Sequence, residues 1–155
     1  VIPEPDIEED MAMVPGVDGQ KMSKSYGNAI EIFADEKSLR EKVMRIKTDS
    51  TPVDQPKPLE NNILFELYSL FLDEAGKAAL KERFLTPGLR YGDIKKELFG
   101  VIWDYFAPYR KERQRLLQDR QYVLDVMKEG ARKAREVGSI YLERARRNVG
   151  LDYWR

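Results

Sequence analysis

Apolar residues spaced three to four positions apart run through the sequence from residue 35 onward, and this spacing restricts the fold more than any other feature. It places apolar side chains on one face of a helix, whereas a half-buried strand alternates at every second residue. Charged residues make up 35% of the 155 residues, which is above the ~25% usual in globular domains. They suit the solvent-facing sides of amphipathic helices. We therefore expect an all-α helical bundle, preceded by a loop-rich leader.

Turn-forming and capping residues divide the helical region into segments. We expect the fourth helix to begin near Tyr91 and to kink at Pro108, because proline lacks the backbone N–H. The last helix should run from about residue 121 to 149, and three prolines make 48–58 a connector. The residues that can cap the earlier helices are Asp35, Asn61 or Asn62, and Asp73.

Large apolar side chains at helical spacing are expected to form the core rather than a ligand site. They are Phe65, Tyr68, Phe71, Phe84, Phe99, Trp103, Phe106, Met44 and Met127.

The sequence contains neither cysteine nor histidine, which excludes several classes of site. Disulfides, thiolate metal sites and histidine-based catalytic triads are all impossible. A zinc site would need carboxylates alone, so we expect no metal site. Because no apolar run approaches the ~18 residues of a membrane span, we expect a cytoplasmic protein without a membrane partner.

Charge is distributed unevenly, although the formal net charge is zero. Residues 1–20 hold six acidic residues and no basic one, whereas residues 110–147 hold twelve basic and six acidic residues. This imbalance indicates a basic surface suited to nucleic acid. The alternative is a solvated helix surface carrying Glu–Arg pairs.

The segment Lys21-Met22-Ser23-Lys24-Ser25 is the strongest candidate for chemistry. Two lysines three residues apart, with a hydroxyl between them, can stabilise the negative charge of phosphoryl oxygens. Gly16 and Gly19 allow such a loop to move between open and closed forms. Taken as a pattern alone, however, two lysines in a glycine-containing loop are more often a solvated turn.

The same pentapeptide resembles the second signature of the class I aminoacyl-tRNA synthetases. Its flanks resemble the bacterial tryptophanyl-tRNA synthetase family, and the similarity runs from residue 1 to about residue 150. Tyrosyl-tRNA synthetases are the nearest relatives, but their bacterial members usually carry a divergent form of this loop, so we favour tryptophan. The resembling segments are Pro15-Gly16-Val17-Asp18-Gly19-Gln20 before the loop, Tyr26-Gly27-Asn28 after it, Lys47-Thr48-Asp49-Ser50-Thr51-Pro52, Tyr91-Gly92-Asp93-Ile94-Lys95-Lys96-Glu97-Leu98 and Tyr105-Phe106-Ala107-Pro108-Tyr109-Arg110.

The resemblance implies a reaction and a site. The family activates tryptophan with Mg-ATP to Trp-AMP and transfers it to tRNA(Trp), without a tightly bound cofactor. The implied catalytic residues are Lys21, Ser23 and Lys24, and the implied ATP-binding residues are Gly19, Lys21, Met22, Ser23, Lys24 and Ser25. The implied tRNA-binding residues are Arg110, Arg113, Lys128, Arg132 and Arg135.

The resemblance also implies two domains: residues 1–34 would end a Rossmann catalytic domain, and 35–155 would form the helical anticodon-binding domain. The first class I signature, which contains histidine, is missing, and the sequence begins without methionine. We therefore expect the chain to be part of a longer protein that forms a homodimer. The half of that protein that is missing here would contact tryptophan. We expect no tryptophan activation by this chain alone. A non-catalytic helical module that binds tRNA or protein, or part of a tyrosyl enzyme, remains an alternative.

Overall fold

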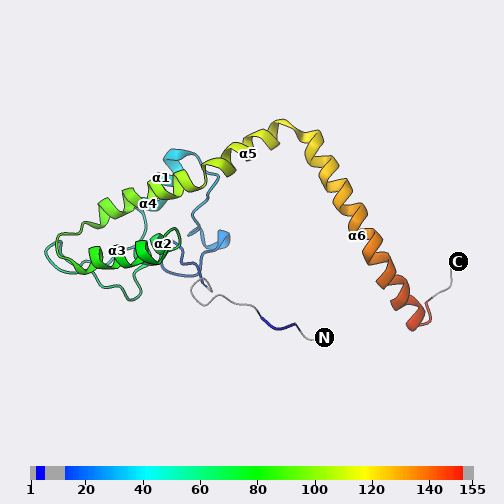
Figure 1. Ribbon diagram of the computed structural model, residues 1–155, viewed down its shortest axis with the longest axis horizontal. Helices are drawn as coiled ribbons and strands as arrows, with labels where there is room; N and C mark the ends of the chain where they lie inside the picture. Colours follow the sequence, from blue (N-terminus) through cyan, green and yellow to red (C-terminus); the bar gives the residue numbers. More distant parts are fainter. Residues whose placement is uncertain (1–2, 6–12, 152–155) are drawn as a thin grey trace. The chain divides into compact units, whose positions relative to one another are not determined.

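The computed structural model describes residues 3–5 and 13–151, and these residues form helices joined by loops (Figure 1). Within these ranges the only strand-like pairing is an isolated antiparallel bridge between Pro15 and Lys21. None of the described helices is long and apolar enough to cross a membrane. The predicted all-α class is confirmed. The chain divides into an N-terminal unit, Val1–Pro108, and a C-terminal unit, Tyr109–Arg155, which we describe separately.

Four α-helices form the framework of the N-terminal unit: α1 (Glu36–Met44), α2 (Ile63–Ser69), α3 (Glu74–Leu85) and α4 (Tyr91–Tyr105). The predicted starts of the first three helices are confirmed by their caps. The side chains of Asp35, Asn62 and Asp73 each accept a hydrogen bond from the backbone N–H three residues further on. A cap of this kind stabilises a helix by ~1 kcal/mol.

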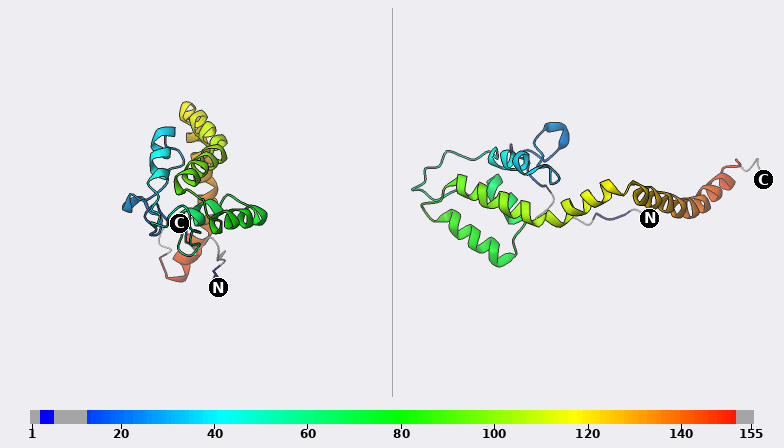
Figure 2. Two further views of the ribbon diagram at one scale, coloured as in Figure 1. Left: turned by 90° about the vertical axis from the view of Figure 1, so that its left-hand side faces the viewer. Right: turned by 90° about the horizontal axis from the view of Figure 1, so that it is seen from above.

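The core of the N-terminal unit lies between these helices. Helix α1 packs against α4, α4 also contacts α2, and α2 contacts α3 (Figures 1 and 2). Apolar side chains from the leader, Val14, Val17, Met22 and Ile30, pack against the same core. The leader is therefore part of the packed unit. The buried residues are Leu39, Val43, Ile46, Leu64, Leu67, Tyr68, Leu80, Phe84, Ile94, Leu98 and Ile102.

The side chains predicted to form the core differ in their burial. Tyr68 and Phe84 are buried. Met44 and Met127 are 38% and 65% exposed, so their assignment to the core is wrong. For Met127 the physical reason is that α6 (Arg120–Asn148) buries none of its side chains. The other five, which are half-buried and packed against the core, are Phe65, Phe71, Phe99, Trp103 and Phe106.

A break separates α4 from α5 (Ala107–Gln118). It lies at Phe106, which has φ −91° and ψ 4°, two residues before the predicted kink at Pro108. Pro108 stands in the first turn of α5, where a backbone N–H has no helical partner. In a continuous helix its ring would clash with the turn before it, so the chain ends one helix and starts another.

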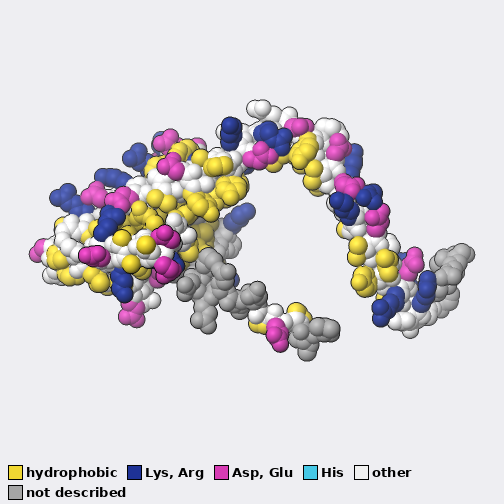
Figure 3. Space-filling model, viewed as in Figure 1, with side chains coloured by type: hydrophobic (Ala, Val, Ile, Leu, Met, Phe, Trp, Pro, Cys, Tyr) yellow, Lys and Arg dark blue, Asp and Glu magenta, His cyan; other side chains and the backbone are white. Residues whose placement is uncertain are grey.

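The C-terminal unit consists mainly of α6, which follows α5 after one residue, Asp119. The Asp119 side chain caps α6 by accepting a hydrogen bond from the backbone N–H of Tyr122. Beside this junction the Arg115 guanidinium lies over the Tyr122 ring, 5.2 Å from its centroid. Hydrophobic and charged side chains are both exposed along α6 (Figure 3).

A buried lysine organises the connector between α1 and α2. Lys57 is only 2% exposed, and its ammonium group donates to the backbone oxygens of Thr51, at 2.7 Å, and Pro52, at 2.5 Å. The ammonium group also lies 5.2 Å from the centroid of the Tyr91 ring. A buried charge is tolerated when it is paired with polar groups in this way.

The phenol of Tyr91 should ionise well above the ordinary pKa of tyrosine. It donates a 2.8 Å hydrogen bond to Asp49, and burial together with this carboxylate raises the pKa of Tyr91 from 10.0 to about 12. Because the folded-state pKa is raised, the stability contributed by the neutral phenol is present below pH 10 and is lost as pH rises through about 12. An absorbance titration of phenolate should show a group that ionises near pH 12, and Tyr91→Phe should remove it. Burial also raises the pKa of Tyr68, so the late ionisation of that phenol should remain in the variant. If the variant titrates as the wild type does, another tyrosine is responsible.

Candidate functional site

The Lys21–Ser25 segment sits on a tight turn that the glycines make possible. The backbone N–H of Gly16 donates to the Gln20 carbonyl at 2.7 Å, and that of Gly19 donates to the Gly16 carbonyl at 3.0 Å. Gly19 has φ +88°, a conformation that L-residues rarely adopt. The turn brings Val14 and Met22 together, and the Met22 backbone N–H donates to the Val14 carbonyl at 2.9 Å.

The second half of the segment forms a short 3-10 helix, η2 (Lys24–Tyr26). Gly27 ends it with φ +64°, and the Gly27 carbonyl accepts a 2.6 Å hydrogen bond from the Lys42 ammonium on α1. On the other side, the Lys47 backbone N–H donates to the Val17 carbonyl at 2.7 Å. The loop is therefore attached to α1 and to the connector at its two ends.

The side chain of Met22 anchors the loop, whereas those of Lys21, Lys24 and Ser25 are exposed and that of Ser23 is half-buried. Met22 is half-buried and packs against the core. Lys21 and Lys24 are exposed, and within the described ranges their ammonium groups make no hydrogen bond or ion pair. The Ser23 and Ser25 hydroxyls lie 2.8 Å apart. Two unpaired ammonium groups and two hydroxyls on one short loop are suited to a polyphosphate.

Sequence reasoning missed the side chain that holds this loop together. Asn28 is 2% exposed and contacts three separate points of the loop. The sequence singled it out only as part of a flank. Its burial depends on Gly16 and Asp18, ten to twelve residues earlier in the chain, and such packing is not visible in local spacing.

The predicted tRNA-binding residues lie on two helices. Arg110 and Arg113 belong to α5, where Arg110 is half-buried and Arg113 exposed. Lys128, Arg132 and Arg135 belong to α6 and are all exposed.

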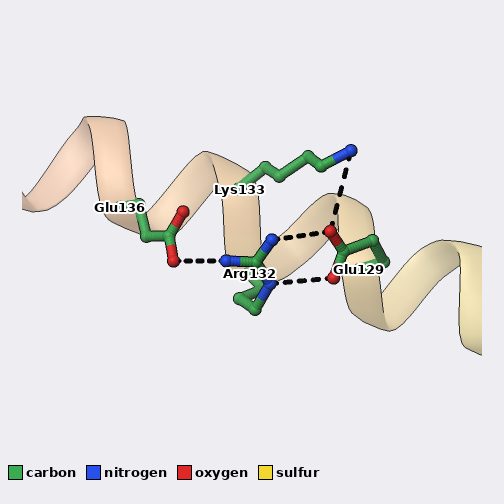
Figure 4. Close-up of polar contacts among 4 residues, drawn as sticks. All are labelled: Glu129, Arg132, Lys133 and Glu136. Carbon is green, nitrogen blue, oxygen red and sulfur yellow. Dashed lines mark hydrogen bonds and ion pairs between the residues drawn. The ribbon is translucent and has the colours of Figure 1, made fainter.

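Arg132 is the most strongly paired of these side chains (Figure 4). Its guanidinium donates to Glu129 at 2.6 and 2.8 Å and also to Glu136, while Lys133 lies 3.6 Å from Glu129. The hydrogen bonds to Glu129 and then Glu136 raise the pKa of Arg132. This cluster matches the alternative of a solvated helix carrying Glu–Arg pairs. The two carboxylates use three of the five N–H donors of Arg132 and offset its charge, which makes it a weaker phosphate ligand.

Lys128 and Arg135 are less strongly paired with carboxylates than Arg132 is. The Lys128 ammonium lies 3.8 Å from Asp125, and Arg135 makes no hydrogen bond or ion pair with any residue that the structure describes. The two positions are seven residues apart, close to two full turns, so they share one side of α6. These two cations are the better candidates for contact with an anion.

Comparison with known proteins assigns the class. The profile of the family described as "tRNA synthetases class I (W and Y)" matches residues 3–107, and the chain belongs to this family. Two curated relatives are tryptophan–tRNA ligases. The tryptophan–tRNA ligase of Fusobacterium nucleatum is 46% identical over 97% of this chain and 46% of its own length. That of Rhodopirellula baltica is 46% identical over 90% of this chain and 44% of its own length.

A solved structure from the same family has a similar fold. The crystal structure of tryptophanyl-tRNA synthetase from Campylobacter jejuni, complexed with ADP and tryptophan, matches with a TM-score of 0.82 at 38% identity, covering 96% of this chain and 47% of that one. The chain thus spans about half the length of the relatives it matches.

Proposed function

We propose that this chain provides the pyrophosphate-stabilising loop and the tRNA-binding helices of a tryptophan–tRNA ligase. The observation that carries the proposal is the pair of ammonium groups of Lys21 and Lys24, which have no partner among the described residues, on a glycine turn that the core anchors through Met22. The names of the relatives support tryptophan over tyrosine as the amino acid. The functional boundary near residue 34 stays a prediction.

The proposed reaction has two steps. A carboxylate oxygen of tryptophan attacks the α-phosphorus of ATP, the bond from that phosphorus to the bridging oxygen breaks, and pyrophosphate leaves. A hydroxyl of the terminal adenosine of tRNA(Trp) then attacks the Trp-AMP carbonyl, and AMP leaves. Lys21, Ser23 and Lys24 act in the first step by stabilising charge on the departing pyrophosphate, without a covalent enzyme intermediate.

In the proposed reaction, Mg²⁺ is bound to the phosphates of ATP. Within residues 3–5 and 13–151 no three His, Cys, Asp or Glu side chains form a group that could hold a metal ion. Phosphate oxygens of a nucleotide are ordinary Mg²⁺ ligands, and the ion usually keeps several waters. Mg²⁺ would therefore arrive on ATP, and the lysines of the loop would add fixed positive charge beside it.

The tRNA-binding role leads to a paired test on α6. Arg135→Ala is expected to weaken tRNA(Trp) binding and to make the slope of log K against log salt shallower by about one. Arg132→Ala, its matched control one turn away, should change binding less because Glu129 and Glu136 already occupy the Arg132 side chain. Filter binding over a salt series measures both. Equal losses in the two variants would contradict the ranking, and no loss in either would remove α6 from the tRNA interface.

A further inference from the structure

The side chain of Asn28 contacts three points on one turn of the loop. Its Oδ1 accepts a 2.8 Å hydrogen bond from the backbone N–H of Ser23. Its Nδ2 donates to Asp18 Oδ1 at 2.9 Å and to the Lys21 carbonyl at 3.2 Å. An asparagine amide offers one acceptor oxygen and two N–H donors, so both donors and the oxygen are in use. The partners also fix its orientation, because only the oxygen can face an N–H.

The Asn28 side chain occupies the space that a side chain on residue 16 would need. A Cβ on residue 16 would lie 2.4 Å from Asn28 Cγ and Nδ2, so only glycine fits there without displacing the amide. The Asn28 backbone is fixed as well, because its carbonyl accepts a 3.0 Å hydrogen bond from the Val17 N–H. Asn28 is therefore a rigid point from which the loop backbone is held.

The points that Asn28 holds lie on either side of Met22. One is the carbonyl of Lys21 and the other is the N–H of Ser23. These backbone groups belong to the residues whose side chains are proposed to bind pyrophosphate. Asp18 completes the arrangement, because its carboxylate accepts from Asn28 and from the Gln20 backbone N–H at 3.0 Å.

We propose that Asn28, supported by Asp18, is a positioning residue that fixes the loop backbone so that Lys21, Ser23 and Lys24 converge on the leaving pyrophosphate. The inference rests on the proposed function. Asn28 itself touches no substrate, and its effect passes through the backbone of the loop. A misplacement of a catalytic group by ~1 Å can cost about a hundredfold in rate, so the hydrogen bonds from one amide are enough to matter.

The test uses the full-length ligase that carries this sequence and measures tryptophan-dependent exchange between pyrophosphate and ATP. Asn28→Ala and Asn28→Asp are expected to lower kcat by about ten- to a hundredfold, with the KM for tryptophan changed less than about twofold. Asp in place of Asn28 keeps an acceptor for Ser23 but loses both donors and faces Asp18. Asn148→Ala, on the last turn of α6, is the control and should leave kcat unchanged.

A reciprocal exchange separates positioning from folding. In the double variant Asp18→Asn with Asn28→Asp, residue 18 gains an N–H that can donate to residue 28, which restores their hydrogen bond with reversed polarity. The hydrogen bond from the Gln20 N–H is then lost, because Asp18 Oδ1 accepts both. We expect part of the kcat lost in Asn28→Asp to return. Asp18→Asn alone should cost little, because an amide oxygen at residue 18 still accepts from Asn28 and Gln20.

The isolated chain supplies a second readout. The hydrogen bond from Asn28 holds the pKa of the Asp18 carboxyl below its usual value of 3.8, so Asn28→Ala should raise this pKa toward that value in a carbon-13 NMR titration. The amide of Ser23 should also exchange faster with solvent.

The outcomes distinguish the two proposals. If kcat in both Asn28 variants stays within twofold of the wild type while Lys24→Ala lowers it, the positioning role is overturned and the proposed function stands. If KM for tryptophan rises in step with the loss of kcat and the double variant recovers nothing, Asn28 is only structural. If Lys24→Ala has no effect, the proposed function itself fails.

Discussion

Replacing Lys24 with alanine is expected to lower kcat for pyrophosphate exchange by about a hundredfold in the full-length ligase carrying this sequence. Removing one preorganised group from developing transition-state charge typically costs 10²–10³ in kcat, roughly 2.7–4 kcal/mol. The Lys24 side chain is exposed and holds no other described residue in place. Its loss should therefore remove charge from the site without disturbing the fold.

The matched controls are Lys24→Arg and Lys37→Ala. The first keeps the charge and should recover part of the rate, although a guanidinium is larger and planar. The second removes an exposed lysine from α1, away from the loop, and should leave kcat unchanged. Steady-state exchange at saturating ATP and tryptophan measures all three. An unchanged kcat in Lys24→Ala would show that the loop does not stabilise the leaving group.

Local sequence signals predicted the helices well because each has a local cause. Asp35, Asn62 and Asp73 cap the helices that follow them, and each cap is an interaction between residues three positions apart. Proline acts locally too, although the break falls at Phe106 rather than at Pro108. The exact residue at which a helix stops depends on how both flanking segments pack, and spacing does not contain that information.

The sequence predicted which loop to examine but not how it is held. Lys21, Ser23 and Lys24 stand out through the family resemblance of their pentapeptide, because two lysines in a glycine-containing loop are by themselves more often a solvated turn. The role of Asn28 depends on Gly16 and Asp18, ten to twelve residues earlier in the chain, which folding brings into contact with it. Lys57 shows the same limit, because a lysine in a proline-rich connector is expected in solvent and is instead 2% exposed.

The error at Met127 has a different origin. Its spacing on α6 predicts an apolar face, and that face exists, but a periodic pattern does not say what covers it. Side chains on it, such as Val137 at 60% and Tyr141 at 64%, are exposed in the described chain. Amphipathicity therefore predicted the helix correctly and its burial wrongly.

Phe84→Ala is expected to be the most damaging single change to the N-terminal unit. The Phe84 side chain is 0% exposed, and its ring centroid lies 5.4 Å from that of Phe65 and 6.4 Å from that of Tyr91. The change should lower the free energy of unfolding by about 3–5 kcal/mol, through lost apolar burial and the cavity left behind. Domains are commonly stable by only ~5–15 kcal/mol, so such a loss is a large share of the total.

The neighbouring residue Leu85 provides the comparison. It ends the same helix but is 47% exposed, so Leu85→Ala should cost less than about 1 kcal/mol. Urea denaturation followed by the fluorescence of Trp103, in a Trp154→Phe background, measures both variants in the unit to which they belong. A larger loss in Phe84→Ala would place the stability of the unit in contacts among α2, α3 and α4. Equal losses would mean that the space around Phe84 collapses to fill the cavity, and that stability resides elsewhere in the core.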